Sequence, residues 1–290
     1  MKGALMSVWK SASWVLAGLL PAMVLAPMPS QAGAASLATY RAVYDLVLDR
    51  SDQNSNLIDV TGRIVMEFTG SRCSGYKASL RFVTDMAFVS DMTESEGTRR
   101  VTDARTESFE GPSGKDFTFK NQTFIDDALA EESEGNAQRG GKGVSILLTK
   151  PDDKKINLQE AVVFPTEQIE RIIEAARQDR NFLQMNVYDG SENGETVYAT
   201  AVVIGDAIKT ADKADDEQVA KEAGVAGLTH WPVTVSYFDE GKGGEQMPVY
   251  VMSFVLYENG ISRHLKIDYG DFAIVGQLSD LDMLSSEPCP

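Results

Sequence analysis

The two histidines are the first candidates for acid–base chemistry, because imidazole titrates near neutral pH. His230 lies at the start of an apolar alternating run, and His264 alternates with Ser262 and Lys266, which is typical of a surface position. A hydrolytic triad needs a nucleophile and an orienting acid around one histidine, and no serine here lies in a nucleophile-elbow motif. The sequence therefore provides no histidine-based catalytic centre.

Three short motifs occur in the order used by penicillin-recognising serine enzymes, which also act in the cell envelope. Ser74 and Lys77 match Ser-x-x-Lys, Ser191-Glu192-Asn193 resembles Ser-x-Asn, and Lys209-Thr210-Ala211 lacks the glycine of Lys-Thr-Gly. This chemistry needs the serine and lysine one helical turn apart at a helix start. The pattern here predicts a strand start instead, and positions i and i+3 of a strand face opposite sides.

A turn rich in carboxylates is the only candidate metal site. Asp189, Glu192 and Glu195 surround the glycines of this turn and could offer oxygen ligands to calcium, but their spacing is not that of an EF-hand loop. The glycine-rich stretch 140–143 lacks the Ser or Thr and the helix of a phosphate-binding loop. We therefore expect no metal site, no cofactor and no catalytic residue.

Cys73 and Cys289 are the only two cysteines, and they lie 216 positions apart. Two cysteines and two histidines are too few for a structural zinc site. In an exported chain the oxidising compartment favours a disulfide between them. A loop of this length implies a stabilisation of about 5 kcal/mol in the simple chain-entropy description. Two independent buried thiols are the alternative.

Residues 1–32 have the pattern of a secretory signal peptide. Lys2 and Lys10 give a basic start, an apolar run covers 14–25, and Ser30-Gln31-Ala32 places small residues around a cleavage point near Ala32. The run of about 12 apolar residues is shorter than the roughly 20 that a membrane-spanning helix needs. We expect residues 33–290 to be exported as a soluble protein.

The chain is strongly acidic, with 27 basic against 43 acidic side chains and a net charge of −16. Removal of Lys2 and Lys10 with the leader changes this charge to −18. Such a charge repels phosphate backbones and anionic headgroups, so we expect no nucleic-acid partner. Residues 33–290 can bury a large core, and they contain no linker or internal repeat, which indicates a single domain.

Alternating apolar and polar residues predict a chain built mainly of β-strands. The longest run, from Tyr76 to Phe88, places apolar side chains on one face and Lys77, Arg81 and Asp85 on the other. Asn259-Gly260 is a strong hairpin signal between two such runs. Residues 126–134 read as a loop or an exposed strand, and 209–224 as a loop or a frayed helix. The further strands are expected at 40–48, 60–69, 98–109, 117–125, 144–148, 156–164, 182–188, 196–204, 231–237, 249–257, 261–269 and 271–276.

One segment has the period of an amphipathic helix, which we expect over about 166–179. Ile169, Ile172, Ile173 and Ala176 follow the i, i+3, i+4, i+7 pattern, and Thr166 is expected to cap the first turn. A single apolar helix in a β-rich chain most often packs across a sheet or plugs its opening. The concave space inside such a sheet is either filled by side chains or able to hold an acyl chain or a peptide.

Four segments carry a resemblance to a known family: 76–85 (YKASLRFVTD), 188–194 (YDGSENG), 230–238 (HWPVTVSYF) and 247–278, together with the tail around Cys289. They resemble the EipB family of periplasmic cell-envelope integrity proteins, formerly a domain of unknown function. The resemblance covers nearly the whole mature chain. It implies an all-β fold, a broken β-barrel or β-spiral of about 12–14 mostly antiparallel strands around a helix, and a disulfide between Cys73 and Cys289.

The resemblance also implies the absence of enzymatic activity and a role in envelope integrity, especially under stress. We expect a non-enzymatic periplasmic protein that contacts an unidentified periplasmic or envelope protein at a sheet edge or in the concavity. One alternative is a carrier or chaperone that holds an acyl chain or a lipoprotein segment. The weakest alternative is an envelope hydrolase.

Overall fold

The computed structural model describes residues 37–52, 55–89, 97–141, 143–159, 161–209, 217–239, 247–286 and Cys289. Residues 34–290 form one compact unit. The expected leader 1–32 and its cleavage point near Ala32 lie outside the described residues, so both stay predictions. Among the described residues, no helix has the length and apolar character needed to cross a membrane.

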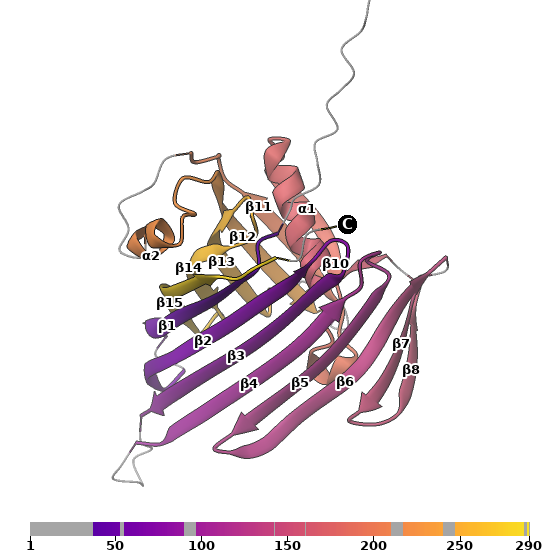
Figure 1. Ribbon diagram of the computed structural model, residues 1–290. Coiled ribbons are helices and arrows are strands. Elements are labelled where there is room, and N and C mark those ends of the chain that lie inside the picture. The colour runs from indigo at the N-terminus through magenta and orange to yellow at the C-terminus, as the bar shows by residue number, and fades with distance from the viewer. Residues whose placement is uncertain are drawn as a thin grey trace, which may run out of the picture. The chain divides into compact units, whose positions relative to one another are not determined.

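Fifteen strands of the described chain form one sheet, in the order β8-β7-β6-β5-β4-β3-β2-β1-β15-β14-β13-β12-β11-β10-β9 (Figure 1). Neighbours are antiparallel except β9 and β10, which are parallel. The all-β expectation is therefore confirmed. The strands are β1 (Tyr40–Ser51), β2 (Leu57–Ser71), β3 (Gly75–Phe88), β4 (Arg99–Glu110), β5 (Asp116–Ile125), β6 (Ala128–Gly140), β7 (Gly143–Lys150), β8 (Lys154–Leu158), β9 (Val162–Val163), β10 (Phe182–Val187), β11 (Tyr198–Ile204), β12 (His230–Asp239), β13 (Tyr250–Tyr257), β14 (Ser262–Asp268) and β15 (Phe272–Met283).

The two edges of this sheet are formed by strands that are consecutive in the sequence. β8 is one edge and β9 is the other, and only residues 159–161 separate Leu158 from Val162. Four residue steps span at most about 14 Å, at 3.3–3.6 Å per residue. The sheet must therefore curl until its edges approach each other. Because β8 and β9 do not pair, the result is a broken barrel, as expected.

The sheet has fifteen strands, more than the expected 12–14, because one expected strand is divided and one segment left open is a strand. The strand expected over 156–164 is divided into β8 and β9, because alternation of apolar residues does not reveal where the chain passes from one edge to the other. The acidic segment left open as loop or strand forms most of β6, between β5 and β7. Its carboxylates are tolerated because one face of an antiparallel sheet can meet water.

The long strand expected over 76–88 is confirmed as β3, which pairs along its length with β2 and β4. Its outward side chains form cross-strand ion pairs, with Arg81 donating to Asp103 at 2.9 Å and Arg99 to Asp85 at 2.6 Å. Hydrogen bonds from Arg81 and Arg105 lower the pKa of the Asp103 carboxyl to about 2. This face is therefore mainly charged and polar, and most of the large apolar residues of β3 point to the other side.

The expected helix is confirmed as α1 (Pro165–Arg177), which packs against β10 and β11 (Figure 1). Ile172 and Ile173 are fully buried. The expected capping role of Thr166 is wrong. The N-cap residue is Phe164, which has no side-chain acceptor, and Pro165 occupies the first helical position. Within 209–224 the described part contains a short helix, α2 (Glu217–Glu222), and η1 (Glu192–Gly194) is a single 3-10 turn.

Two apolar clusters form the core. The larger one joins the inner faces of β1, β2 and β11–β15 to α1, and includes Ile172, Val202 and Ile274 at 0–1% exposure. The smaller one lies against β5–β7 and contains stacked Phe117 and Phe164, whose ring centroids are 4.9 Å apart. The inner face is therefore most deeply buried at β1, β2, β5, β7 and β11–β15, while β4, β8 and β10 contribute few fully buried residues.

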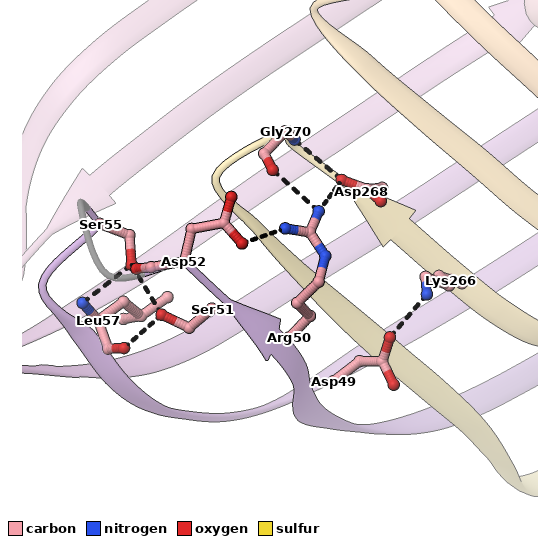
Figure 2. Close-up of polar contacts among 9 residues, drawn as sticks. All are labelled: Asp49, Arg50, Ser51, Asp52, Ser55, Leu57, Lys266, Asp268 and Gly270. Atoms are coloured by element: carbon pink, nitrogen blue, oxygen red, sulfur yellow. Dashed lines mark hydrogen bonds and ion pairs between the residues drawn. The ribbon is translucent and has the colours of Figure 1, made fainter.

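The C-terminal end of β1 is joined to the turn between β14 and β15 by a polar network (Figure 2). The Arg50 guanidinium bonds Asp52 at 2.6 Å, Asp268 at 2.9 Å and the carbonyl oxygen of Gly270 at 2.9 Å. These side chains are partly exposed, so each ion pair contributes little to stability. They link the end of β1 to the turn that precedes β15, its partner strand.

Candidate functional site

A mainly apolar cavity of about 200 Å³ lies between two parts of the curled sheet and the first turn of α1. Four of its lining residues are polar but uncharged, namely Ser108, Thr166, Asn259 and Ser262. No charged residue is among the described residues that line it. The other lining residues are Leu37, Tyr40, Met66, Phe68, Ala78, Pro165, Ile169, Tyr237, Met252, Phe254, Leu256, Gly260 and Leu265.

One wall of the cavity follows from the register of neighbouring strands. Phe68 of β2 pairs with Ala78 of β3, Ala78 pairs with Ser108 of β4, and Ser108 pairs with Phe119 of β5. Two small side chains therefore stand between two aromatic ones on the same face. A small residue between large neighbours leaves space above the sheet, which accounts for the hollow at this position.

The other wall comes from β12–β14, where Tyr237, Met252 and Phe254 are half-buried. Met252 faces a cavity that also has Met66 in its opposite wall. Methionine side chains are flexible and polarizable, so they adapt to apolar ligands of different shape. The hairpin expected at Asn259-Gly260 is confirmed between β13 and β14 and lines the cavity with its turn.

A buried amide stands beside the Tyr237 wall. The Tyr237 hydroxyl donates a hydrogen bond to Oε1 of Gln168, on α1, at 3.4 Å. Burial raises the pKa of Tyr237 above its ordinary value, so the hydroxyl keeps its proton. Gln168 is 5% exposed, and its Nε2 has no hydrogen-bond partner among the described residues. Buried polar groups are rarely left without a partner, so this donor needs an explanation.

Two further tyrosines, Tyr198 and Tyr250, pack against Tyr237. Tyr237 and Tyr250 stack with ring centroids 4.5 Å apart, and Tyr198 meets both rings edge-on. Burial raises the pKa of Tyr198 to about 12. All three phenols are therefore uncharged at neutral pH, in keeping with the uncharged lining of the cavity.

The first turn of α1 is held by a carboxylate from the sheet. Glu110, at the end of β4 and 5% exposed, accepts hydrogen bonds from the backbone N–H groups of Thr166 and Glu167. It replaces the side-chain cap that Phe164 cannot provide. Burial raises the pKa of Glu110 to about 7, against the opposing effect of these hydrogen bonds. Glu110 therefore ties α1 to the β4 end of the cavity wall.

Arg139 joins three further segments at the same helix end. Its guanidinium donates to the carbonyl oxygens of Gly114 and Val162 and to Glu167, at 2.7–2.9 Å. It also lies over the ring of Phe164, 4.8 Å from the centroid. Arg139 thus connects the β6 end, the edge strand β9 and α1, which positions the helix against the sheet.

The two cysteines are bonded to each other in the structure. Cys73 lies in the turn between β2 and β3, Cys289 follows β15, and their Cα atoms are 5.5 Å apart. Next to the bond, Arg72 forms an ion pair with Glu170 of α1 at 3.3 Å. The disulfide therefore lies near the helix and attaches the C-terminal tail to the start of β3.

The residues considered for hydrolysis are not brought together. His230 is fully buried, its Nδ1 lies 3.0 Å from the carbonyl oxygen of Leu228, and its ring packs on Tyr257. Ser74 lies in the exposed β2–β3 turn, where its hydroxyl contacts that of Ser71. The arrangement gives no nucleophile–base pair at these positions.

The other residues considered for chemistry form no candidate site. His264 is exposed on β14, and Lys142, Thr210 and Ala211 lie outside the described residues. Among those described, no group of three His, Cys, Asp or Glu side chains could hold a metal ion. In the carboxylate-rich turn considered as a calcium site, Asp189 accepts a hydrogen bond from the Ser191 N–H, and Glu195 forms an ion pair with Lys154.

Sequence reasoning missed two residues whose hydrogen bonds connect α1 to the sheet. Glu110 and Gln168 are isolated in the sequence, and only the fold brings them to α1. One signal was available. A helix that begins Phe-Pro lacks a capping side chain at Phe164, so its first N–H groups require an acceptor from elsewhere.

Comparisons with known proteins agree on one family. The profile of the EipB-like family matches residues 31–285. The cell envelope integrity protein EipB of Brucella abortus (strain 2308) is 40% identical over 261 residues, covering 88% of this chain and 87% of that protein. A crystal structure of a β-barrel-like protein of the domain of unknown function DUF1849, also from Brucella abortus, has a TM-score of 0.80 and 38% identity. It covers 87% of this chain and 100% of its own. The chain belongs to the EipB-like family.

Proposed function

We propose that the mature chain is a periplasmic protein that supports cell-envelope integrity without catalysing a reaction, by holding a partner in the concavity of its sheet. Membership of the EipB-like family supports the envelope role. The observation that carries the binding mechanism is the uncharged cavity of about 200 Å³ inside a curled sheet. The separation of Ser74 from His230 gives no comparable support to a hydrolase.

The first candidate for the partner is a periplasmic or envelope protein that inserts an apolar segment. A sheet edge such as β8 offers a second place for protein contact, since an edge presents unpaired backbone groups. Lys154 and Lys155 stand on this edge, and both are exposed. Lysines at an edge oppose addition of a further strand. The concavity is therefore the better-supported contact surface.

The second candidate is a carrier or chaperone role for an acyl chain or a lipoprotein segment. Its support is the cavity lining, which is apolar apart from four neutral side chains and includes Met66 and Met252. The high negative charge of the chain argues against a nucleic-acid partner for either candidate.

Genetic complementation with a cavity-filling variant tests the binding role. Ala78→Leu places three more carbon atoms in the cavity, while Ala87→Leu makes the same change on the opposite face of β3. In a strain lacking the gene, we expect wild type and Ala87→Leu to restore growth in detergent, and Ala78→Leu to fail at equal abundance. Full restoration by Ala78→Leu would contradict the proposal.

A third variant tests the absence of catalysis. We expect Ser74→Ala to restore detergent resistance as well as wild type, because the Ser74 hydroxyl bonds locally, to the Ser71 hydroxyl and the carbonyl oxygen of Gly75. Loss of resistance with a normally folded, normally abundant Ser74→Ala protein would support the hydrolase instead.

A further inference from the structure

β10 has an edge that the last strand of the sheet leaves uncovered. β9 pairs with β10 only at Asn186 and Val187, whereas β11 pairs with the whole of β10 from Phe182 onward. Among the described residues, 182–185 therefore have a neighbouring strand on one side only. The side chains of Phe182 and Gln184 are exposed here, that of Phe182 at 51%. An uncovered edge of this kind is a template for a further strand.

The direction of the backbone groups at this edge follows from the pairing on each side. Alternate residues of a strand point their N–H and C=O groups to opposite neighbours. The carbonyl oxygen of Asn181 accepts from the N–H of Ile204 in β11, so the odd-numbered residues face β11. The N–H of Tyr188 donates to β9, so the even-numbered residues face the other way. The N–H and C=O groups of Phe182 and Gln184 thus point to the uncovered edge, and they have no backbone partner within the described chain.

This edge lacks the residues that usually protect a sheet. Lysine or proline at an edge opposes the addition of another strand. The opposite edge, β8, carries the exposed lysines Lys154 and Lys155. Residues 182–185 (FLQM) include neither a charged residue nor a proline. The edge of β10 is therefore the one that remains open to pairing.

The outer face of the sheet next to this edge is uncharged. It lies opposite the core residues Val202 and Val235, and the register aligns its side chains in rows across β10–β13. The rows are Phe182-Val203-Thr234-Ser253, Gln184-Ala201-Ser236-Val251 and Asn186-Ala199-Phe238. Val203, directly opposite Phe182, is 54% exposed. Two large apolar side chains thus stand in water beside the uncovered edge.

Backbone groups and charge together define what this surface accepts. The outward N–H and C=O groups of Phe182 and Gln184 are all satisfied by an extended polypeptide, as in β-strand addition. Uncharged rows accept uncharged side chains, because a charge buried against them would lose its hydration without gaining a counter-ion. The net charge of −16 repels a second copy of this chain and attracts a neutral or basic segment.

We propose that the edge of β10 accepts an extended segment of a partner protein as an added strand, with uncharged side chains beside Phe182 and Val203 and basic residues at the ends of the segment. The cavity lies on the inner face of the sheet, and this surface lies at an edge and on the outer face. The inference therefore goes beyond the proposed function and does not depend on it.

The probe is the peptide acetyl-KTVTVTK-amide, and the measurement is backbone hydrogen exchange by NMR on the mature wild-type protein. Without peptide, we expect the amides of Phe182 and Gln184 to exchange at least about 10-fold faster than those of Leu183 and Met185, which face β11. Saturating peptide should slow exchange at Phe182 and Gln184 at least about 10-fold. The acidic peptide acetyl-ETVTVTE-amide should bind at least about 3-fold more weakly at low salt.

Variants of one residue separate backbone pairing from side-chain contact. Gln184→Pro removes an outward N–H, a change that an edge strand tolerates, and it should abolish the slowing at Phe182. Gln184→Ala keeps this N–H and should bind the peptide as wild type does. If Gln184→Pro does not fold, Gln184→Lys places a protective lysine on the exposed edge and should weaken binding of the basic peptide about 3-fold. Ala78→Leu fills the cavity and should leave peptide binding unchanged.

Three results would overturn the inference: no slowing at Phe182 and Gln184 in wild type, slowing that persists in Gln184→Pro or an unchanged affinity in Gln184→Lys, or equal affinity for the two peptides. A wild-type dimer in sedimentation that Gln184→Pro dissociates would give the edge to a second copy and would also overturn it. Detergent resistance of Ala78→Leu tests the concavity alone, so the two proposals fail separately.

Discussion

The buried carboxyl of Glu110 makes the stability of this protein depend on pH in a predictable direction. Its pKa in the folded protein is about 7, above the ordinary value of 4.5. The folded protein therefore keeps a proton between these values that the unfolded chain releases. The stabilisation linked to this proton is fully present below about pH 4.5 and is lost as the pH rises through 7.

The magnitude follows from the size of the shift. A difference of about 2.5 pKa units, at 1.36 kcal/mol each, corresponds to about 3 kcal/mol between the two ends of this range. Glu110 is 5% exposed, so solvent screening reduces this value little. At roughly 2–4 °C per kcal/mol for a chain of this size, the difference corresponds to about 6–12 °C in Tm.

Glu110→Gln removes the titration and keeps the side-chain shape. The free energy of unfolding is measured in urea at pH 4.5 and pH 8 from the fluorescence of Trp231, which is 3% exposed and the only tryptophan after residue 14. We expect wild type to lose about 3 kcal/mol more than Glu110→Gln over this range.

A matched variant separates this effect from the removal of any carboxylate. Glu107→Gln lies on the same strand, on the opposite and exposed face, and it should follow the wild-type pH dependence. Other titrating groups are common to all three proteins and cancel in the comparison. Equal pH dependence of wild type and Glu110→Gln would refute the assignment of this proton to Glu110.

Three further predictions concern the disulfide and the hydrogen bonds that hold the sheet and α1 together. Cys73→Ala or Cys289→Ala should lower stability by up to about 5 kcal/mol, because the released loop spans 216 residues; equal Tm values for reduced and oxidised wild type would show that the bond is structurally idle. Arg139→Lys should lower the free energy of unfolding by about 1–3 kcal/mol, since a lysine cannot reach Gly114, Val162 and Glu167 together; urea unfolding no different from wild type would contradict this. Tyr237→Phe should lower the free energy of unfolding by about 1 kcal/mol through loss of the hydrogen bond to Gln168. An unchanged midpoint of urea unfolding would show that this bond does not stabilise the fold.

The fold could be predicted from the sequence where local periodicity decides it. The two-residue alternation located β3, and the helical period located α1, because each reflects one face turned toward the core. The passage from β8 to β9 could not be read in this way. Opposite edges of one sheet are brought together by curvature accumulated over fifteen strands, and no local pattern records it.

The candidate site depended on sequence-distant residues and was predicted only in outline. A concave apolar space was expected, since inner-face residues alternate along every strand. Its location was not, because the hollow arises where Ala78 and Ser108 stand beside each other across β3 and β4. The partnership of Gln168 with Tyr237 likewise joins residues 69 positions apart. Such pairs depend on register, which a single sequence leaves open.

Native mass spectrometry of the protein released from cells without detergent tests the binding role of the cavity most directly. The account predicts a bound partner, either an envelope protein or a small molecule of acyl-chain composition, on wild type and on Ala87→Leu, and none on Ala78→Leu. An equal adduct on Ala78→Leu, or an empty wild-type protein, would contradict it.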